Sequence, residues 1–208
     1  RHVIPAIRLI GDWIAPAASI ASGFTVSWSD TYFLSYRLGL GGGGAYQAAY
    51  RVLGLSTYAY VPWGSVIAAR INAAEHHPML RPTVFALVLT AGSLAVATVI
   101  IVFAGNVVFP RFALPIGAVP ALLVLYILSA ISMCYGRALL SLGYFKPVAI
   151  ANVGSVVLAL TGHLVFTLRG NAATAAAVSA SAVAFATVVQ LVVYALLRVK
   201  PRPPRRLH

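Results

Sequence analysis

The sequence predicts an all-α protein, a polytopic transmembrane helix bundle of about six spans with both termini in the cytoplasm. Composition is the first observation: of 208 residues, 61% are hydrophobic and only 9% are charged. The mean hydropathy is +0.91, and such an apolar excess is not that of an ordinary soluble domain. The second observation is a succession of apolar stretches, each near the roughly 20 residues that a helix needs to cross about 30 Å of hydrocarbon.

The expected spans follow from hydropathy, and glycine, proline and charged residues mark their boundaries. They cover residues 13–36, 46–69, 83–105, 117–141, 147–168 and 172–197. Short connections predict antiparallel neighbours, and these are Arg37–Ala45 with its run Gly41–Gly44, Arg70–Pro82, Asn106–Ile116, Leu142–Lys146 and Arg169–Asn171.

The net charge of +12 is spread unevenly over these connections. If the N-terminus is inside, eleven Lys and Arg residues lie on the cytoplasmic side and four on the other side, namely Arg37, Arg51, Arg111 and Arg169. Because Lys and Arg are retained on the cytoplasmic side, this bias predicts that both termini are inside. We interpret the charge as a topology signal facing anionic lipid, and no nucleic-acid partner is expected.

The two ends of the chain carry separate expectations. Residues 1–11 lack the apolar core and cleavage site of a signal peptide, and the chain begins with Arg1, so we expect a fragment or a processed product. Residues 200–208 form a basic, proline-rich segment. We expect this segment to be a cytoplasmic tail near the lipid headgroups.

The first expected span has a polar face. Its members recur at intervals of three and four and are Pro16, Ser19, Gly23, Ser27 and Asp30. Such a face avoids lipid, and an acidic residue within a span usually faces a bundle interior or an aqueous cavity. Asp30 is therefore the leading functional candidate, with an anchoring role at the outer interface as the alternative. If Asp30 is deep, Arg51 is its nearest candidate partner in the sequence.

The second span is rich in aromatic residues, with Tyr46 and Tyr50 at its start and Tyr58 and Tyr60 nearer its middle. Such residues form an interfacial belt or packing, or they line the route of a polyhydroxylated substrate. Pro62 removes one helical hydrogen bond and predicts a kink at this point.

The later spans contain few polar groups. Arg137 lies about one turn inside the cytoplasmic end of the fourth span, where it either snorkels to the interface or faces a substrate. Asn152 and His163 in the fifth span need partners within the bundle, and His163 is expected to be a packing residue. The last span has small residues at four-residue spacing, which predicts close helix contact; these are Ala172, Ala176, Ala180 and Ala184.

The sequence predicts neither an enzyme nor a metal or cofactor site. Three acidic residues in the whole chain leave little for acid–base catalysis. Glu75, His76 and His77 are adjacent, but no further ligand follows at a useful spacing, so we expect a solvated loop. Cys134, the single cysteine, is expected to pack as a small hydrophobic residue.

Two regions of the chain carry a resemblance. The first reads Asp-Thr-Tyr-Phe-Leu-Ser-Tyr-Arg-Leu-Gly over residues 30–39 and Gly-Ala-Tyr-Gln-Ala-Ala-Tyr-Arg over residues 44–51. The second contains the turn Leu-Gly-Tyr-Phe-Lys-Pro at residues 142–147 and, after Asn152, Arg-Gly-Asn-Ala-Ala-Thr-Ala-Ala-Ala from residue 169. In this order the motifs resemble the polysaccharide-export flippases of the multidrug/oligosaccharidyl-lipid/polysaccharide exporter superfamily. The chain departs from the family pattern at Ala45 and at Asn171.

The resemblance implies a definite architecture. Members have two six-helix lobes related by pseudo-symmetry, and a central cavity with alternating access moves a lipid-linked oligosaccharide across the bacterial cytoplasmic membrane. Residues 1–199 would form one lobe, which the basic ending suggests is the C-terminal one. Such a lobe needs either its missing second lobe or a homodimer partner.

The resemblance also implies roles for six residues. Asp30 would lie at the cavity or gate, Arg51 and Arg137 would attract the substrate's diphosphate, and Tyr46, Tyr50 and Asn152 would line the path. Arg suits phosphate because its planar fork donates two hydrogen bonds.

Two other functions compete with the flippase. One is a cation-coupled multidrug exporter of the same superfamily, which needs acidic groups within the spans. The other is a non-transporting membrane scaffold or assembly subunit, which would bury the polar face of the first span in packing. Solvent access to Ser19, Ser27 and Asp30 distinguishes a cavity from packing.

Overall fold

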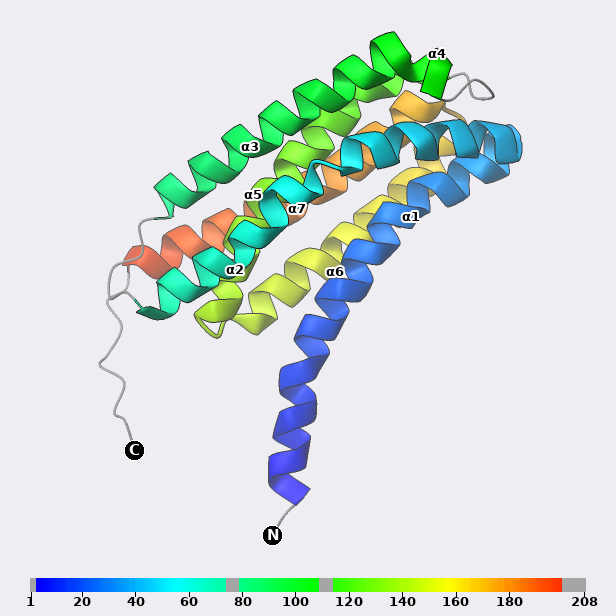
Figure 1. Cartoon of the computed structure of the whole chain (residues 1–208). Helices are drawn as coiled ribbons and strands as arrows, with labels where there is room; N and C mark the ends of the chain where they lie inside the picture. Colours follow the sequence, from blue (N-terminus) through cyan, green and yellow to red (C-terminus); the bar gives the residue numbers. More distant parts are fainter. Residues whose placement is uncertain (1–2, 74–78, 109–113, 200–208) are drawn as a thin grey trace.

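The computed structural model describes residues 3–73, 79–108 and 114–199, and these residues form helices joined by turns and loops (Figure 1). The predictions for Glu75, His76, His77 and the tail 200–208 fall outside them. The α-helices are α1 (Val3–Gly54), α2 (Thr57–Ala73), α3 (Leu80–Val99), α4 (Gly105–Val108), α5 (Val119–Ser141), α6 (Phe145–Gly162) and α7 (Ala172–Val199). Two π-helical turns, η1 (Ile100–Ala104) and η3 (His163–Thr167), and one 3₁₀ turn, η2 (Ile116–Ala118), extend α3, α6 and the start of α5.

The helices are those of a multi-pass membrane protein. Four described segments are long and apolar enough to span a bilayer: Leu80–Phe103, Ile116–Ser141, Phe145–Thr167 and Ala172–Leu197. They coincide with the last four expected spans. A further pair, Ala21–Gly54 with Thr57–Ala69, is bent by 48° at its break and would raise the number to five. The count of six spans and the cytoplasmic termini stay predictions.

The first expected connection differs from its prediction. Helix α1 reverses direction at Gly39, whose φ of 75° and ψ of 174° suit glycine (Figure 1). The run Gly41–Gly44 is helical and lies after the turn. A Cβ at Gly43 would lie 1.9 Å from the Ser35 Oγ atom. Gly42 and Gly43 therefore allow the two arms of α1 to approach closely, whereas we expected the run to form the turn itself.

The helix is interrupted at a different position from the kink that we expected at Pro62. Pro62 lies within α2, and the helix breaks earlier, at residues 55 and 56. Near the end of α1, the Tyr126 hydroxyl donates to the Tyr50 carbonyl at 2.7 Å. A Cβ at Gly54 would lie 3.0 Å from the same hydroxyl. A contact from α5 thus accompanies the break, and this contact is invisible in the local sequence.

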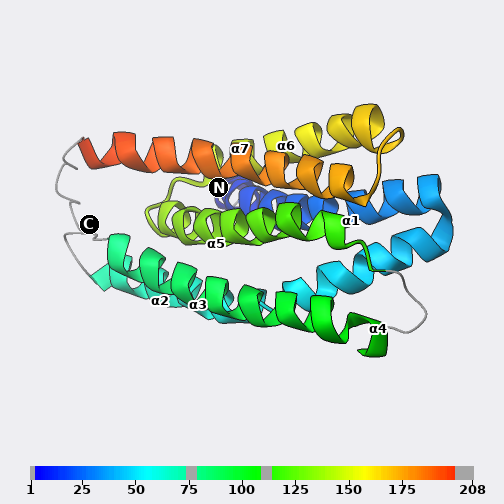
Figure 2. The ribbon, with the colours of Figure 1, turned by 90° about the horizontal axis from the view of Figure 1, so that it is seen from above.

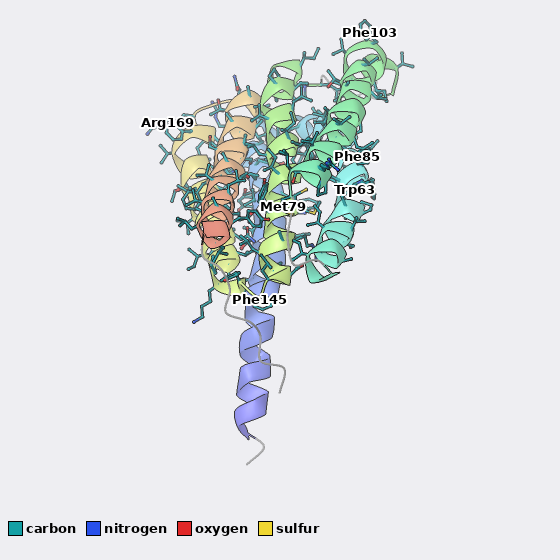
Figure 3. All side chains as sticks on the ribbon, turned by 90° about the vertical axis from the view of Figure 1, so that its left-hand side faces the viewer. Trp63, Met79, Phe85, Phe103, Phe145 and Arg169 are labelled. Atoms are coloured by element: carbon teal, nitrogen blue, oxygen red, sulfur yellow. The ribbon has the colours of Figure 1, made fainter. Side chains whose placement is uncertain are left out.

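Helix α7 contacts α5, α6 and α1, and α5 lies between α7 and an outer layer formed by α2 and α3 (Figure 2). The expected close contact of the last span is confirmed for Ala176 and Ala180, which are buried with Tyr46 and Leu122 in one apolar cluster. The outer layer is joined by Trp63 of α2 and Phe85 of α3, whose rings meet edge to face with centroids 4.6 Å apart (Figure 3).

Candidate functional site

A cavity of about 400 Å³ lies among α1, α5, α6 and α7. This volume is within the range of small-molecule sites in proteins. The lining of α5 runs from Leu125 to Leu140, which corresponds to roughly 22 Å at 1.5 Å per residue. The cavity is therefore elongated along the helices.

The lining follows from helical periodicity, because residues three, four and seven positions apart share a face. Every helix around the cavity presents such a face, with polar residues among the apolar ones. The lining consists of Gly23, Val26, Ser27 and Tyr50 from α1, Leu125, Ser129, Ser132, Met133, Gly136, Arg137 and Leu140 from α5, Val148, Asn152 and Ser155 from α6, and Ser179, Val183, Ala186 and Gln190 from α7.

Three polar side chains on one wall form a relay that joins three helices. The Ser132 hydroxyl of α5 donates to Gln190 Oε1 of α7 at 2.9 Å, and Gln190 Nε2 donates to Asn152 Oδ1 of α6 at 3.4 Å. Gln190 is only 2% exposed, whereas Asn152 is half-buried. A Cβ at Gly136 would lie 3.4 Å from Gln190 Nε2, so α5 leaves a slot for this amide.

Arg137 is the one charged residue among the described residues that line the cavity. Its side chain is exposed and crosses α2 at Gly64, where a Cβ would lie 3.1 Å from Arg137 Cγ and 2.6 Å from Met133 Sδ. Glycine at position 64 thus leaves room for the arginine stem. The resulting cavity combines hydroxyl and amide groups with a single positive charge.

A second polar cluster is centred on Asp30, which is fully buried. Tyr46 Oη donates to Asp30 Oδ2 at 2.6 Å, and the Thr31 backbone N–H donates to Oδ1, also at 2.6 Å. The Gln47 amide donates to the Thr31 hydroxyl. Both arms of α1 therefore converge on one carboxyl group, and Asp30 lies inside the bundle rather than at its surface.

Ser179 connects this cluster to the cavity. Its Oγ donates to Asp30 Oδ2 at 3.5 Å and lies 3.3 Å from His163 Nε2, and Ser179 also lines the cavity. His163 is fully buried, with Nδ1 2.8 Å from the Thr167 hydroxyl and its ring stacked on Phe33. His163 has partners on both ring nitrogens and packs within the bundle, as expected.

The structure divides the six predicted site residues into three groups. Tyr50, Arg137 and Asn152 line the cavity. Asp30 and Tyr46 lie beside it in the buried cluster, and Arg51 is exposed outside the cavity lining.

The suggested pairing of Asp30 with Arg51 is wrong. Among the described hydrogen bonds, those of Asp30 come from Tyr46, Thr31 and Ser179, while the Arg51 side chain is exposed. Proximity in the sequence favoured Arg51, but the arms of α1 instead place a tyrosine hydroxyl against the carboxyl group.

Sequence reasoning missed Ser129, Ser132, Ser179 and Gln190. The signal was present, because a polar residue inside a long apolar helix needs an interior partner. Ser129, Ser132 and Gly136 also recur at the spacing of one helical face. These intervals would have pointed to the α5 wall of the cavity.

No group of three or more potential metal-ligating His, Cys, Asp or Glu side chains occurs within residues 3–73, 79–108 and 114–199. Comparison of the chain with protein-family models, with curated proteins and with solved structures gives no match. The functional interpretation therefore depends on the residues and on the geometry of the cavity.

Proposed function

We propose that this chain forms one lobe of a membrane transporter that flips a lipid-linked oligosaccharide across the bacterial cytoplasmic membrane by alternating access. The observation that carries the proposal is a cavity with polar side chains on a largely apolar lining, inside a bundle of apolar spans. Polar groups are costly within a bilayer and usually mark a substrate path or an interhelical contact. The resemblance of the motifs around Asp30 and Arg137 supports the same function.

The residue roles follow from position. Arg137 attracts the anionic phosphate groups of the substrate, and Asn152 and Tyr50 contact its polar part within the cavity. Asp30 and Tyr46 do not line the cavity and influence it indirectly, through the hydrogen bond from Ser179 to Asp30. Arg51 belongs to the approach to the cavity, since its side chain is exposed outside the lining.

The proposed lobe works with a partner. A path that alternates between two sides of a membrane is commonly built between two lobes. We propose that the missing second lobe or a second copy of this chain completes the path, with the bilayer holding the lipid part of the substrate.

The test is transport of a lipid-linked oligosaccharide by the complete protein in proteoliposomes. We expect Arg137→Ala and Asn152→Ala to lower the initial rate at least several-fold at equal protein levels. Ala95→Ser, an exposed position on α3 outside the cavity lining, is the matched control and should keep the rate. Unchanged transport by both cavity variants would overturn the assignment of the cavity as the path.

A cation-coupled exporter is the second candidate, and the buried Asp30 cluster favours it. A carboxyl group that contacts both arms of α1 and α7 is a suitable place for coupling ion binding to helix movement. Asp30→Asn would then abolish the dependence of transport on an ion gradient. A purely scaffolding function would leave a cysteine at Ser27 protected from polar thiol reagents.

A further inference from the structure

The relay of Ser132, Gln190 and Asn152 has a feature that interhelical packing alone does not require. Gln190 is nearly completely buried, and both ends of its amide are occupied, by Ser132 and by Asn152. Asn152, in contrast, is half-buried at the cavity wall. Its Oδ1 accepts from Gln190, and its NH₂ group carries two further donors.

The slot at Gly136 fixes the central amide. A Cβ at this position would lie 3.4 Å from Gln190 Nε2 and 3.5 Å from Oε1, so the amide lies flat against the α5 backbone. An amide held in this way also holds the Asn152 side chain, whose oxygen is already engaged. The free donors of Asn152 are thereby preset before a ligand arrives, which lowers the ordering cost of binding.

The surroundings determine the chemistry of the ligand. Around the relay, the cavity wall carries the neutral hydroxyls of Ser129, Ser155 and Ser27. Each hydroxyl donates to a backbone carbonyl of its own helix and keeps the capacity to accept a hydrogen bond. Neutral amides and hydroxyls discriminate through hydrogen bonds, because a ligand lacking the matching group leaves buried polar atoms unpaired. Arg137, five positions after Ser132 on α5, lines the same cavity.

We infer that Ser132, Gln190 and Asn152 form a glycosyl-recognition subsite, in which Asn152 donates to a sugar hydroxyl or N-acetyl oxygen and Gln190 is the positioning residue. The inference rests on the proposed function and adds the group that is recognised, an uncharged sugar next to an anion. Arg137 contacts the anion. Sugar and anion are thus contacted by different side chains, the sugar by Asn152 of α6 and the anion by Arg137 of α5.

The experiment uses the complete protein in detergent, with every native cysteine, Cys134 included, replaced by serine and Ser129→Cys as a reporter in the cavity wall. The rate of reaction with a polar maleimide is measured alone and with three soluble probes: a methyl glycoside of N-acetylglucosamine, N-acetylglucosamine 1-phosphate, and inorganic phosphate. We expect the sugar phosphate to slow labelling at least fivefold, and each single-group probe to slow it less. A lipid-linked form of the same sugar in vesicles shows whether the lipid adds to this protection.

The variants separate the two halves of recognition. Gln190→Met and Asn152→Ala should abolish protection by the methyl glycoside and keep protection by phosphate, while Arg137→Ala should do the reverse. Asn152→Ala keeps the inference testable if Gln190→Met fails to fold. The matched control is Thr187→Val, which removes an interhelical hydrogen bond from α7 to the Leu128 carbonyl outside the cavity lining. It should leave both kinds of protection intact.

The outcomes distinguish the inference from the proposed function. A reporter that never reacts with the maleimide means that the cavity is closed, which overturns both. A reporter that reacts but is not protected by any glycoside overturns the subsite and leaves the transport proposal standing. Equal loss of glycoside protection in Gln190→Met and Thr187→Val would show that the relay is only a packing contact.

Discussion

At the scale of single residues, the most informative group is the buried carboxyl of Asp30. A buried polar group is costly unless it is hydrogen-bonded, and Asp30 has donors from Tyr46, Thr31 and Ser179. Two of these come from helix arms that are distant in sequence. Asp30 therefore joins segments of the bundle as well as marking a candidate functional position.

Tyr46→Phe removes the donor nearest to this carboxyl and leaves the ring in place. We expect a loss of about 1 to 3 kcal/mol in the free energy of unfolding, because Asp30 Oδ2 keeps only the longer contact with Ser179. Reversible unfolding in mixed micelles, followed by circular dichroism, measures the change.

Tyr126→Phe is the matched control for Tyr46→Phe. It also removes one tyrosine hydroxyl, but the lost partner is the neutral Tyr50 carbonyl, and we expect a cost of about 1 kcal/mol. A larger loss in Tyr126→Phe than in Tyr46→Phe would contradict the view that Asp30 is the more demanding partner.

At the scale of elements, glycines determine how closely helices approach. Small residues let backbones pack closely in a bilayer, where the hydrophobic effect does not drive helix association. Gly43 lies against Ser35 in the two arms of α1, and Gly154 lies against Phe185 between α6 and α7. At both positions a larger residue is excluded by the neighbouring side chain, and the backbone angles themselves do not require glycine.

Gly43→Ala should force the arms of α1 apart, since the new Cβ would lie 1.9 Å from Ser35 Oγ. We expect destabilisation of about 1 to 3 kcal/mol, the usual cost of overpacking, measured by unfolding in mixed micelles. Gly41→Ala is the control, because nothing lies within 4 Å of its Cβ. It should be neutral, or stabilising by up to about 1 kcal/mol through helix propensity. Equal destabilisation in both variants would refute the close approach.

The start of α7 depends on Asn171, whose Oδ1 accepts from the Thr174 backbone N–H at 3.1 Å. Asn171→Ala removes this cap and should cost about 1 kcal/mol, while Asn171→Ser retains a capping oxygen and should recover most of the loss. Hydrogen exchange of the first turn of α7 is the measurement. Unaltered protection in Asn171→Ala would exclude a capping role.

At the scale of the whole molecule, α6 joins opposite ends of the bundle, with the turn at residues 142–144 before it and that at residues 168–171 after it (Figure 1). The distribution of Lys and Arg predicts that the first turn lies in the cytoplasm and the second outside. This orientation is independent of the proposed substrate, and it is tested separately.

Single cysteines at Ser141 and Leu168, in a background where every native cysteine including Cys134 is replaced by serine, test the orientation in intact cells. We expect an impermeant thiol reagent to label Leu168→Cys directly and Ser141→Cys only after the cells are permeabilised. Labelling in the opposite pattern would reverse the topology, and labelling of both without permeabilisation would contradict a span between them.

The sequence alone predicts the features that depend on amino-acid composition and on the spacing of apolar residues. The spans at residues 83–105 and 172–197 were predicted closely, because a long apolar helix leaves a continuous hydropathy signal. The break at residues 55 and 56 was not predicted, since it is accompanied by a contact from Tyr126, 76 residues from Tyr50. Pro62, the obvious local signal, remains within its helix.

The candidate site was predicted in part for the same reason. Arg137 and Asn152 stand out as polar residues in apolar spans, and both line the cavity. The Asp30 partners could not be assigned, because the choice between Arg51 and Tyr46 depends on how the two arms of α1 lie side by side. Gln190 is also a polar residue in an apolar span, but the alanines around it give the stronger pattern, which predicts helix packing alone.

The second arm of α1, residues 40–54, has mechanical consequences. It is a helical segment bounded by the turn at Gly39 and by the interruption at residues 55 and 56. The chain can therefore change direction at both of its ends. This segment contains Tyr46, which donates a hydrogen bond to Asp30, and Tyr50, which forms part of the cavity wall. A rotation of this segment about either end therefore changes the hydrogen bond between Tyr46 and Asp30 and the shape of the cavity together.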